Sequence, residues 1–366
     1  MPGVTEADGH ERLRRRRLRS QLLSGPPADT PEAVVGHLLA VQAQDERGFR
    51  LAVRSRSAGL VTGDVDAALD DRRLLVTWLN RGTLHLVRAE DYWWLHRLTA
   101  HRVLPGVQRR LRQLGVGPGE EERGVATIVG GLDADGPMTR HQLRARLDAD
   151  GVPTAGQALV HLLAASSLRG LVVRGPMEAG HHAFVSVDKW LGPPPVRPDR
   201  AEDLDRLVRR YLVGHAPGRP EDLAQWAGIT LGDARLAFAG ASDALRQTVD
   251  GAVLLTGPTS TPRPAAGRLL GPFDPILHGW ASREPFVGVH RSVVTSNGIF
   301  RPVCLVGGRV VGIWTLPSRG PVIELLEEVD TAGRDALVAD AGDVVRFLGH
   351  AGGAVTFADS NRGRGR

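Results

Sequence analysis

The sequence predicts an α+β protein in which three tandem winged-helix domains precede a C-terminal β-barrel-like α+β domain. Two observations predict this architecture. Segments with helical apolar spacing followed by a pair of short apolar runs, the order of a winged helix, occur three times before residue 260. Beyond Pro262 the sequence changes to short strands and turns. The expected units are winged helices at 10–115, 119–192 and 199–260, a β-rich domain at 264–358, and a disordered tail at 359–366.

The first winged helix begins with a segment that alternates arginine with leucine and therefore predicts a helix with a basic face. Asn80-Arg81-Gly82 separates two apolar runs, which indicates a β-hairpin. We interpret Trp78, Trp93 and Trp94 as core residues rather than base-stacking platforms. The expected elements are helices over 10–23, 31–40, 48–57, 62–69 and 89–99, and a hairpin of 74–78 with 83–87.

The middle of the chain repeats this plan twice. A turn and a cap precede the short second helix each time, at Gly136–Thr139 and at Gly218–Glu221. Gly192-Pro193-Pro194-Pro195 predicts the linker between the two repeats. The expected helices are 120–132, 141–147 and 155–168, then 201–213, 220–227 and 230–238; the expected strand pairs are 171–175 with 183–187, and one near 245–255.

The C-terminal part is expected to contain a small barrel or curved sheet over 266–316, with Gly307-Gly308 as a tight turn between two strands. A run of helical spacing near the end of the chain predicts one long helix. The expected strands are 286–289, 303–306, 310–315, 322–327 and 354–357, and the expected helix is 331–348.

Composition limits the classes of function. The only cysteine, Cys304, excludes an internal disulfide and most metal sites. The sequence contains no apolar run near the roughly 18 residues of a membrane span and no signal-peptide pattern, so we expect a cytoplasmic protein. The net charge is +5, and every basic residue except Lys189 is arginine. Arginine binds a phosphate through two hydrogen-bond donors, which favours a nucleic-acid partner. GC-rich coding produces the same excess of arginine over lysine. Composition therefore supports a nucleic-acid partner without establishing it.

Two glutamines stand where the second expected helix ends. On a regular helix, Gln42 and Gln44 would project about 200° apart, because one turn takes about 3.6 residues. In an extended segment they project to the same side. The spacing therefore indicates two amides aimed together from the segment after the helix; the alternative is two polar residues at a helix end.

These glutamines belong to a set of motifs that occur in order along the chain. The segments Leu38–Gln44, Trp78–Leu86, Arg268–Pro275 and Arg301–Trp314 together resemble the bacterial winged-helix DNA glycosylases related to AlkZ and YcaQ. The resemblance covers roughly residues 12 to 350. The Gln-apolar-Gln form looks like the AlkZ branch, since the YcaQ branch typically has an acidic residue at the second position. Downstream the family often has an acidic residue before an arginine, whereas this chain has Ser282-Arg283, which leaves the role of that hairpin in doubt.

The resemblance implies a function and a set of site residues. It implies a DNA glycosylase that removes bulky N7-alkylated purines, unhooks interstrand crosslinks, and serves self-resistance to a DNA-alkylating natural product. Gln42 and Gln44 are the expected catalytic residues; which of them positions the water stays open. Arg81, His85 and Arg283 are the expected DNA contacts; the alternative for Arg81 is a turn arginine, and for His85 an internally bonded histidine. The expected partner is double-stranded DNA, bound by a monomer without metal or cofactor.

Neighbouring residues offer alternatives. Asp45 and Glu46 could supply a base, although a solvated turn is the simpler interpretation. Asp274 is expected to cap a turn. Glycosylases that also nick the backbone form a Schiff base with an amine, and only Lys189 and the N-terminus are available, so we expect no lyase activity.

A competing class of function remains possible at the level of sequence. A non-enzymatic winged-helix protein, either a transcription regulator or a binder that sequesters a drug or lesion, would share the fold and the basic charge. A regulator usually dimerises to read spaced half-sites, which three winged helices in one chain do not need. His181-His182 lacks partner cysteines at zinc spacing, and Gly115–Gly119 has no strand before it, so neither predicts a metal or dinucleotide site.

Overall fold

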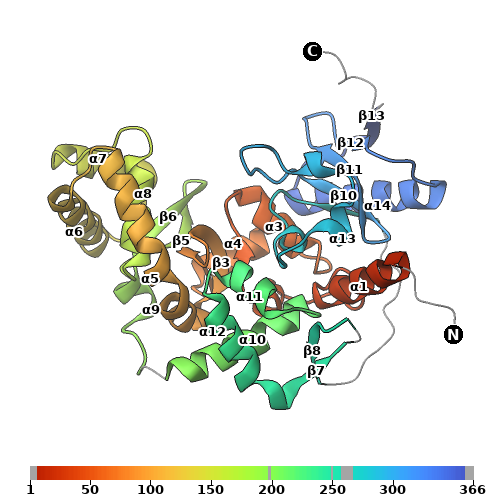
Figure 1. Cartoon of the computed structure of the whole chain (residues 1–366). Coiled ribbons are helices and arrows are strands. Elements are labelled where there is room, and N and C mark those ends of the chain that lie inside the picture. The colour runs from red at the N-terminus through yellow and green to blue at the C-terminus, as the bar shows by residue number, and fades with distance from the viewer. Residues whose placement is uncertain (1–5, 197–198, 249, 257–266, 359–366) are drawn as a thin grey trace.

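The computed structural model describes residues 6–196, 199–248, 250–256 and 267–358 (Figure 1). The tail 359–366, expected to be disordered, lies outside the described residues. The described chain combines helices with sheets, which confirms the predicted α+β class. Among the described residues no helix is both long and apolar enough to cross a membrane.

The N-terminal part contains the predicted helices and hairpin in the predicted order. The last helix is longer than expected, because it continues beyond Thr99 and through Pro105. The elements are α1 (Glu6–Ser20), α2 (Pro31–Leu38), β1 (Val41–Gln42), α3 (Glu46–Arg54), α4 (Thr62–Asp70), β2 (Leu74–Leu79), β3 (Thr83–Arg88) and α5 (Ala89–Gln113).

The two middle segments also follow the predicted order. Thr139 caps α7 by accepting a hydrogen bond from the Gln142 amide, as the turn-and-cap pattern predicts. The elements are α6 (Pro118–Asp135), β4 (Met138–Thr139), α7 (Arg140–Ala149), α8 (Ala158–Leu168), β5 (Val172–Glu178), β6 (His181–Ser186) and α9 (Val187–Leu191), then α10 (Arg200–His215), α11 (Pro220–Ala227), α12 (Leu231–Gly240), η1 (Ser242–Ala244), β7 (Leu245–Gln247) and β8 (Val253–Leu255).

Strands of the first two expected winged helices lie in one sheet. Its order is β1-β3-β2-β5-β6-β4, and β2 joins β5 where Val76 pairs with Arg174. At one edge, Gln42 of β1 pairs with His85 of β3. The strands β7 and β8 form a separate two-stranded sheet. The number of winged-helix domains and their boundaries stay a prediction.

The C-terminal part differs from the expectation in two places. Its five strands form an open sheet in the order β13-β12-β11-β10-β9, so no closed barrel forms within the described residues. Residues expected as a strand at 286–289 instead contribute to a short helix that begins at Glu284; its first turn accommodates Pro285, because an amide hydrogen there would have no partner within the helix. The elements are β9 (Arg268–Leu270), η2 (Pro275–Leu277), α13 (Glu284–Val287), η3 (Arg291–Val293), β10 (Val303–Val306), β11 (Arg309–Thr315), β12 (Val322–Leu325), α14 (Thr331–Leu348) and β13 (Thr356–Ala358).

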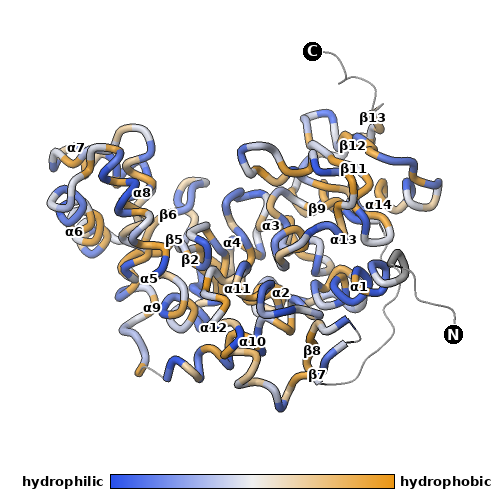
Figure 2. The backbone as a smooth tube through the Cα atoms, viewed as in Figure 1, coloured by the Kyte–Doolittle hydropathy of each residue, from blue (hydrophilic) through white to orange (hydrophobic). Residues whose placement is uncertain are grey.

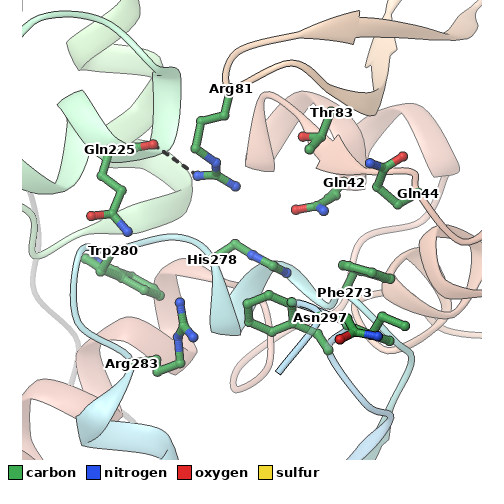
Figure 3. Close-up of a pocket in the computed structure, with 13 residues that line it drawn as sticks. Gln42, Gln44, Arg81, Thr83, Gln225, Phe273, His278, Trp280, Arg283 and Asn297 are labelled. Carbon is green, nitrogen blue, oxygen red and sulfur yellow. Dashed lines mark hydrogen bonds between the residues drawn. The ribbon is translucent and has the colours of Figure 1, made fainter. Parts of the chain in front are cut away.

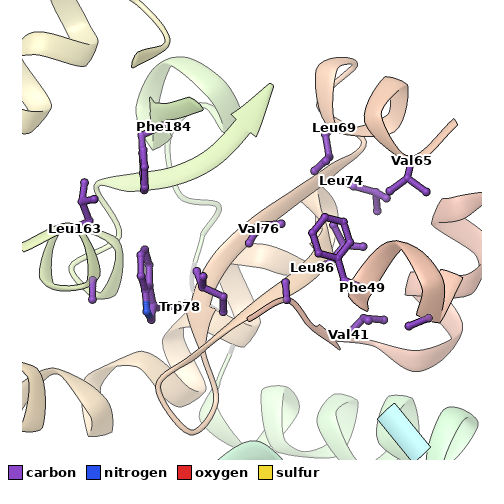
Figure 4. Close-up of a cluster of buried hydrophobic side chains, with 14 of the residues drawn as sticks. Val41, Phe49, Val65, Leu69, Leu74, Val76, Trp78, Leu86, Leu163 and Phe184 are labelled. Atoms are coloured by element: carbon purple, nitrogen blue, oxygen red, sulfur yellow. The ribbon is translucent and has the colours of Figure 1, made fainter. Parts of the chain in front are cut away.

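Three clusters of buried side chains hold these elements together. The largest includes Trp78 and Phe184 at one part of the six-stranded sheet and Phe49 and Leu86 at another (Figure 4). Hydrophobic residues also run along β9 and β11 in the C-terminal part (Figure 2). Trp78 and Trp94 are buried and Trp93 is partly buried against the second cluster, which confirms their interpretation as core residues.

The first helix and the turn that follows it pack against the C-terminal part of the chain. Leu18 and Leu23 belong to the same buried cluster as Trp280 and Phe286. The guanidinium of Arg17 lies 4.3 Å from the centre of the Trp280 ring. The segment 271–300 is therefore supported by both N-terminal and C-terminal parts, and this segment forms one wall of the site described next.

Candidate active site

A pocket of about 410 Å³ opens where β1, the β2–β3 turn and α11 meet the segment 271–300 (Figure 3). Its wall combines amides, two arginines, a histidine and aromatic rings, and no carboxylate among the described residues lines it. The lining residues are Gln42, Gln44, Arg81, Thr83, Gln225, Phe273, His278, Trp280, Arg283, Asn297, Gly298, Ile299 and Phe300.

Both glutamines face this pocket, as their spacing predicts. Helix α2 ends at Leu38, and Leu39 turns the backbone with a φ of 68°, an uncommon conformation for a non-glycine residue. The Ala43 amide then donates to the Leu84 carbonyl at 2.7 Å, which holds the segment extended beside β3. Gln42 is only 8% exposed and its Oε1 has no hydrogen-bond partner among the described residues, whereas Gln44 is exposed.

The adjacent acidic residues have structural roles. Asp45 caps α3 by accepting a hydrogen bond from the Gly48 amide at 2.6 Å. Glu46 is exposed, and its carboxylate lies 3.9 Å from the Arg174 guanidinium. Neither side chain lines the pocket, which fits the interpretation of the pair as turn residues rather than as a base.

Arg81 and Arg283 bring positive charge to the pocket from opposite sides (Figure 3). Arg81 donates to the carbonyls of Gln225 at 3.1 Å and Trp226 at 3.4 Å, so α11 holds the tip of the hairpin. The Arg283 guanidinium lies 4.8 Å from the centre of the Phe300 ring. Burial, and then the nearby charge of Arg283, lower the pKa of Arg81 from its usual range. Two cations this close suit an anionic ligand group such as a phosphate.

His85 does not line the pocket. Its side chain is 3% exposed, and its Nδ1 lies 2.9 Å from the Thr83 carbonyl. Burial, then the charge of Arg81, lower the pKa of His85 to about 3, so the ring is neutral. The burial of this ring leaves it little access to a ligand, and the role of His85 as a DNA contact stays a prediction. The backbone of His85 pairs with Gln42 across the sheet, next to the glutamine segment.

Asp274 caps a turn, as predicted, because it accepts a hydrogen bond from the Ile276 amide at 3.0 Å and begins η2. The sequence did not reveal its second partner. The two terminal nitrogens of Arg56, Nη2 and Nη1, donate to Asp274 at 2.7 and 2.9 Å, and the two side chains are fully buried. This ion pair anchors the start of the segment that carries Phe273 and His278.

Two lining residues, Thr83 and Phe273, lie in motif segments without having been singled out, whereas His278, Gln225 and Phe300 lie outside those segments. The rings of His278 and Phe300 lie 3.9 Å apart between centres, and Phe273 lies nearly parallel to His278 at 6.1 Å. Burial, followed by the charges of Arg81 and Arg283, holds the pKa of His278 well below its usual range. No local signal marks His278, Gln225 or Phe300, since the fold brings them to the pocket from separate parts of the chain.

The pocket suits hydrogen bonding and electrostatic stabilisation more than acid-base chemistry by carboxylates. Besides the two arginines, its polar groups include amides, a hydroxyl and a neutral imidazole, which can donate or accept hydrogen bonds without changing charge. Among the residues that the structure describes, no group of three or more His, Cys, Asp or Glu side chains gathers as a metal site would require. Stacked aromatic rings offer a surface for a flat ring system.

Comparisons with known proteins agree with this architecture. A curated protein of Streptomyces sahachiroi named "Interstrand DNA cross-link repair glycosylase" is 28% identical over 355 residues, covering 91% of this chain and 95% of that protein. The solved structure of Streptomyces sahachiroi DNA glycosylase AlkZ matches with a TM-score of 0.78 and 26% identity, covering 95% of this chain and 99% of the other.

The family comparison separates the two classes of function that the sequence left open. A family profile described as "DNA glycosylase AlkZ-like" matches residues 35–347, which include every residue that lines the pocket. This match favours an enzyme over a non-enzymatic DNA-binding protein. The chain belongs to the AlkZ-like family of DNA glycosylases.

Proposed function

We propose that this DNA glycosylase hydrolyses the N-glycosidic bond of bulky N7-alkylated purines in double-stranded DNA, without lyase activity. The proposal includes the unhooking of interstrand crosslinks, which the name of the Streptomyces sahachiroi relative supports for that protein. It also includes a role in self-resistance to a DNA-alkylating natural product, and a monomer as the working form.

One observation carries the proposal. Gln42 lines the pocket together with Gln44, is 8% exposed, and has a buried Oε1 without a hydrogen-bond partner among the described residues. An amide oxygen held in this way accepts a hydrogen bond from water and orients its lone pair toward a reacting carbon. Gln42 is therefore the residue that we propose as the water ligand, and Gln44, which is exposed, as the one that contacts the DNA strand.

The chemistry explains why an amide suffices. An N7-alkylated purine carries a positive charge, so it departs as a neutral base and needs no general acid. The remaining barrier is the positive charge that develops on the sugar as the bond to C1′ breaks. Fixed dipoles aimed at such a charge typically contribute several kcal/mol, since they need no reorganisation during the reaction.

The charges around the pocket support DNA as its ligand. We propose that Arg81 and Arg283 contact the phosphates that flank the lesion, with His85 as a support of the sheet beneath Gln42. The planar guanidinium of arginine presents donors that match the oxygens of a phosphate, so two arginines suit a phosphate ligand. The cationic purine itself would be placed against the aromatic wall of Phe273 and Phe300.

The lysine content supports hydrolysis without strand cleavage. The only lysine, Lys189, lies in α9, and its amine donates to the Asp133 carbonyl; it does not line the pocket. A lyase needs a free amine at C1′ of the sugar to form a Schiff base. We therefore expect an intact strand with an abasic site as the product.

The test is base release from two duplexes, one with a single bulky N7-alkylguanine and one with an interstrand crosslink between guanine N7 atoms. We expect free alkylated base, an alkali-labile abasic site, and no complex trapped by borohydride. Tight binding of both duplexes without release of base would contradict the proposal. A borohydride-trapped complex would contradict only the absence of lyase activity.

A further inference from the structure

The second half of helix α5 carries arginines on an exposed face. Arg102, Arg109 and Arg112 are all exposed, and they follow one another at i, i+7 and i+10. Because successive residues of a helix are about 100° apart, the three lie within one sector of roughly 80°. We call these three residues the α5 arginine stripe. Gly106 lies between the first two, is exposed, and a Cβ there would meet nothing within 4 Å.

The α5 arginine stripe has no counter-charge of its own. None of its guanidinium groups forms an ion pair with a carboxylate of the described residues, whereas exposed arginines elsewhere, such as Arg73 and Arg346, do so. At the start of α6, the carboxylates of Glu121 and Glu122 pair with Arg169 instead. Exposed cations without counter-charges favour a polyanionic partner, because its phosphates gain charge-assisted hydrogen bonds without breaking an ion pair.

The stripe begins next to the wall of the pocket. Arg102 Nε donates to the Gly228 carbonyl at the end of α11, at 3.1 Å. A Cβ on Gly228 would lie 3.2 Å from the Arg81 amide nitrogen, and one on Gly82 would lie 2.7 Å from Val103. The turn whose Arg81 lines the pocket therefore packs against the start of the stripe. From there α5 runs toward α6 and α7, so the stripe leads away from the pocket (Figure 1).

We propose that the α5 arginine stripe binds the phosphates of the duplex arm on one side of the lesion, while the pocket holds the lesion itself. The inference rests on the proposed function, and it adds a surface that fixes the direction of the duplex on the enzyme. Arg102 and Arg112 are ten residues apart, about 15 Å along a helix, which corresponds to roughly four base-pair steps. The stripe therefore fits backbone that flanks the lesion and contacts no reacting atom.

Gly106 allows the charge of the stripe to be changed without disturbing the packing. Its backbone is helical and glycine is a poor helix former, so Gly106→Glu, Gly106→Gln and Gly106→Lys should unfold no more easily than wild type. A glutamate at this position lies one turn from Arg102 and Arg109, where it competes with phosphates for both. Gly342→Glu is the matched control, because Gly342 is an exposed glycine of α14 with nothing within 4 Å.

The first measurement is the affinity of the full chain for a duplex with one central N7-alkylguanine, at several salt concentrations. We expect Gly106→Glu to bind more weakly and to reduce the slope of log Kd against log salt by about one, the usual share of one phosphate contact. Gly106→Lys should bind more tightly than wild type, and Gly106→Gln and Gly342→Glu should stay near wild type. Equal affinities and slopes in Gly106→Glu and Gly342→Glu would overturn the inference.

Duplexes with one arm shortened test the direction of the DNA. An arm of about two base pairs is shorter than the roughly four that the stripe spans, so it leaves part of the stripe without phosphates. We expect wild type and Gly106→Glu to bind nearly equally when one particular arm is cut, and to keep their difference when the other is cut. A difference that survives either cut would contradict a one-sided surface and overturn the inference.

Base release by wild type separates this inference from the proposed function. Release together with equal DNA binding by Gly106→Glu and Gly342→Glu would overturn the inference and leave the proposed function standing. Weaker binding by Gly106→Glu, dependent on one arm, with no base release by wild type would support the stripe as a DNA surface and overturn the proposed function.

Discussion

The buried pair of Arg56 and Asp274 links two parts of the chain that are 218 residues apart. Arg56 also donates to Gln21, so the residues after α1, the residues after α3 and the pocket wall meet at one guanidinium. A buried ion pair is costly to form, because both charges lose their hydration, and costly to break, because the remaining charge stays buried. Because the pair lies beside Phe273 and His278, it also fixes the position of this wall of the pocket.

Asp274→Asn should therefore destabilise the protein by about 3–5 kcal/mol, since Arg56 loses its counter-charge without gaining water. Urea unfolding monitored by tryptophan fluorescence measures the loss. Glu11→Gln is the matched control, because the Glu11–Arg15 pair is exposed and should contribute less than about 1 kcal/mol. Equal stability of the two variants would contradict the anchoring role of Asp274.

The helices and strands were the most predictable part of the structure. Helix α14 was predicted with its observed bounds, and the hairpin of β2 and β3 with small differences at its ends, because regular spacing and turn residues mark them. The strand expected at 286–289 was wrong: its apolar run forms part of α13 and packs its buried residues into a cluster with Trp280. Such short runs fit either structure, and tertiary packing decides between them.

The residues of the pocket likewise divide into those that the sequence could predict and those that it could not. Gln42, Gln44, Arg81 and Arg283 were proposed from motifs, and the structure brings all four to one pocket. His278 could not be predicted to join them, because its position depends on the path of the segment 271–300 across the β1 edge. The pairing of β2 with β5 was equally out of reach, since it joins two hairpins that local patterns describe separately.

The tip of the hairpin depends on a glycine in another element. Gly228, at the end of α11, has a φ of +69°, and a Cβ there would lie 2.8 Å from the Asn80 carbonyl oxygen. Gly228→Ala must therefore strain its own backbone and also push away the turn that carries Arg81. Gly180→Ala is the matched control, since it has a φ of +81° and nothing within 4 Å.

We expect Gly180→Ala to lower the free energy of unfolding by roughly 1 kcal/mol, the usual strain of a non-glycine residue at positive φ. Gly228→Ala should cost at least about 1 kcal/mol more, because of the added clash, and should weaken DNA binding. Denaturant unfolding and DNA affinity test both variants. Equal losses of stability and of DNA affinity in the two variants would show that the hairpin moves away at no cost and that α11 does not hold it.

At the scale of the whole molecule, three neutral histidines buried in different places connect stability with pH. Burial lowers the pKa of His85, His182 and His215 to about 3 each. In the unfolded chain a histidine titrates near 6.5, so between about pH 6.5 and 3 the unfolded state binds protons that the folded state does not. The stabilisation from these groups is complete above that range and is lost progressively as pH falls through it.

We expect each of these histidines to cost about 2 kcal/mol of stability between pH 7 and pH 5. Urea unfolding at both pH values measures the loss, and His215→Gln should reduce it by about that amount. Tyr211→Phe is a control without a change of histidine; it removes the hydrogen bond to the Gly279 carbonyl at 2.7 Å and should keep the wild-type pH dependence. An unchanged loss in His215→Gln would show that His215 is protonated in the folded state.

The placement of Gln42 and Gln44 connects the sequence motif and the fold with the proposed hydrolysis. The measurement that tests it most directly is single-turnover release of base from an oligonucleotide with one N7-alkylguanine, compared for wild type, Gln42→Ala, Gln44→Ala and Gln225→Ala. Gln225 lines the same pocket, but its contact with Arg81 is made by its backbone carbonyl, so the control keeps that contact.

We predict that Gln42→Ala slows release by about 10²–10³-fold, the usual effect of removing one preorganised polar group, with little change in DNA affinity. Gln44→Ala should also slow release, and Gln225→Ala should stay near the wild-type rate. Release by Gln42→Ala at the wild-type rate, or a loss explained entirely by weaker DNA binding, would contradict the account of this pocket as the hydrolytic site.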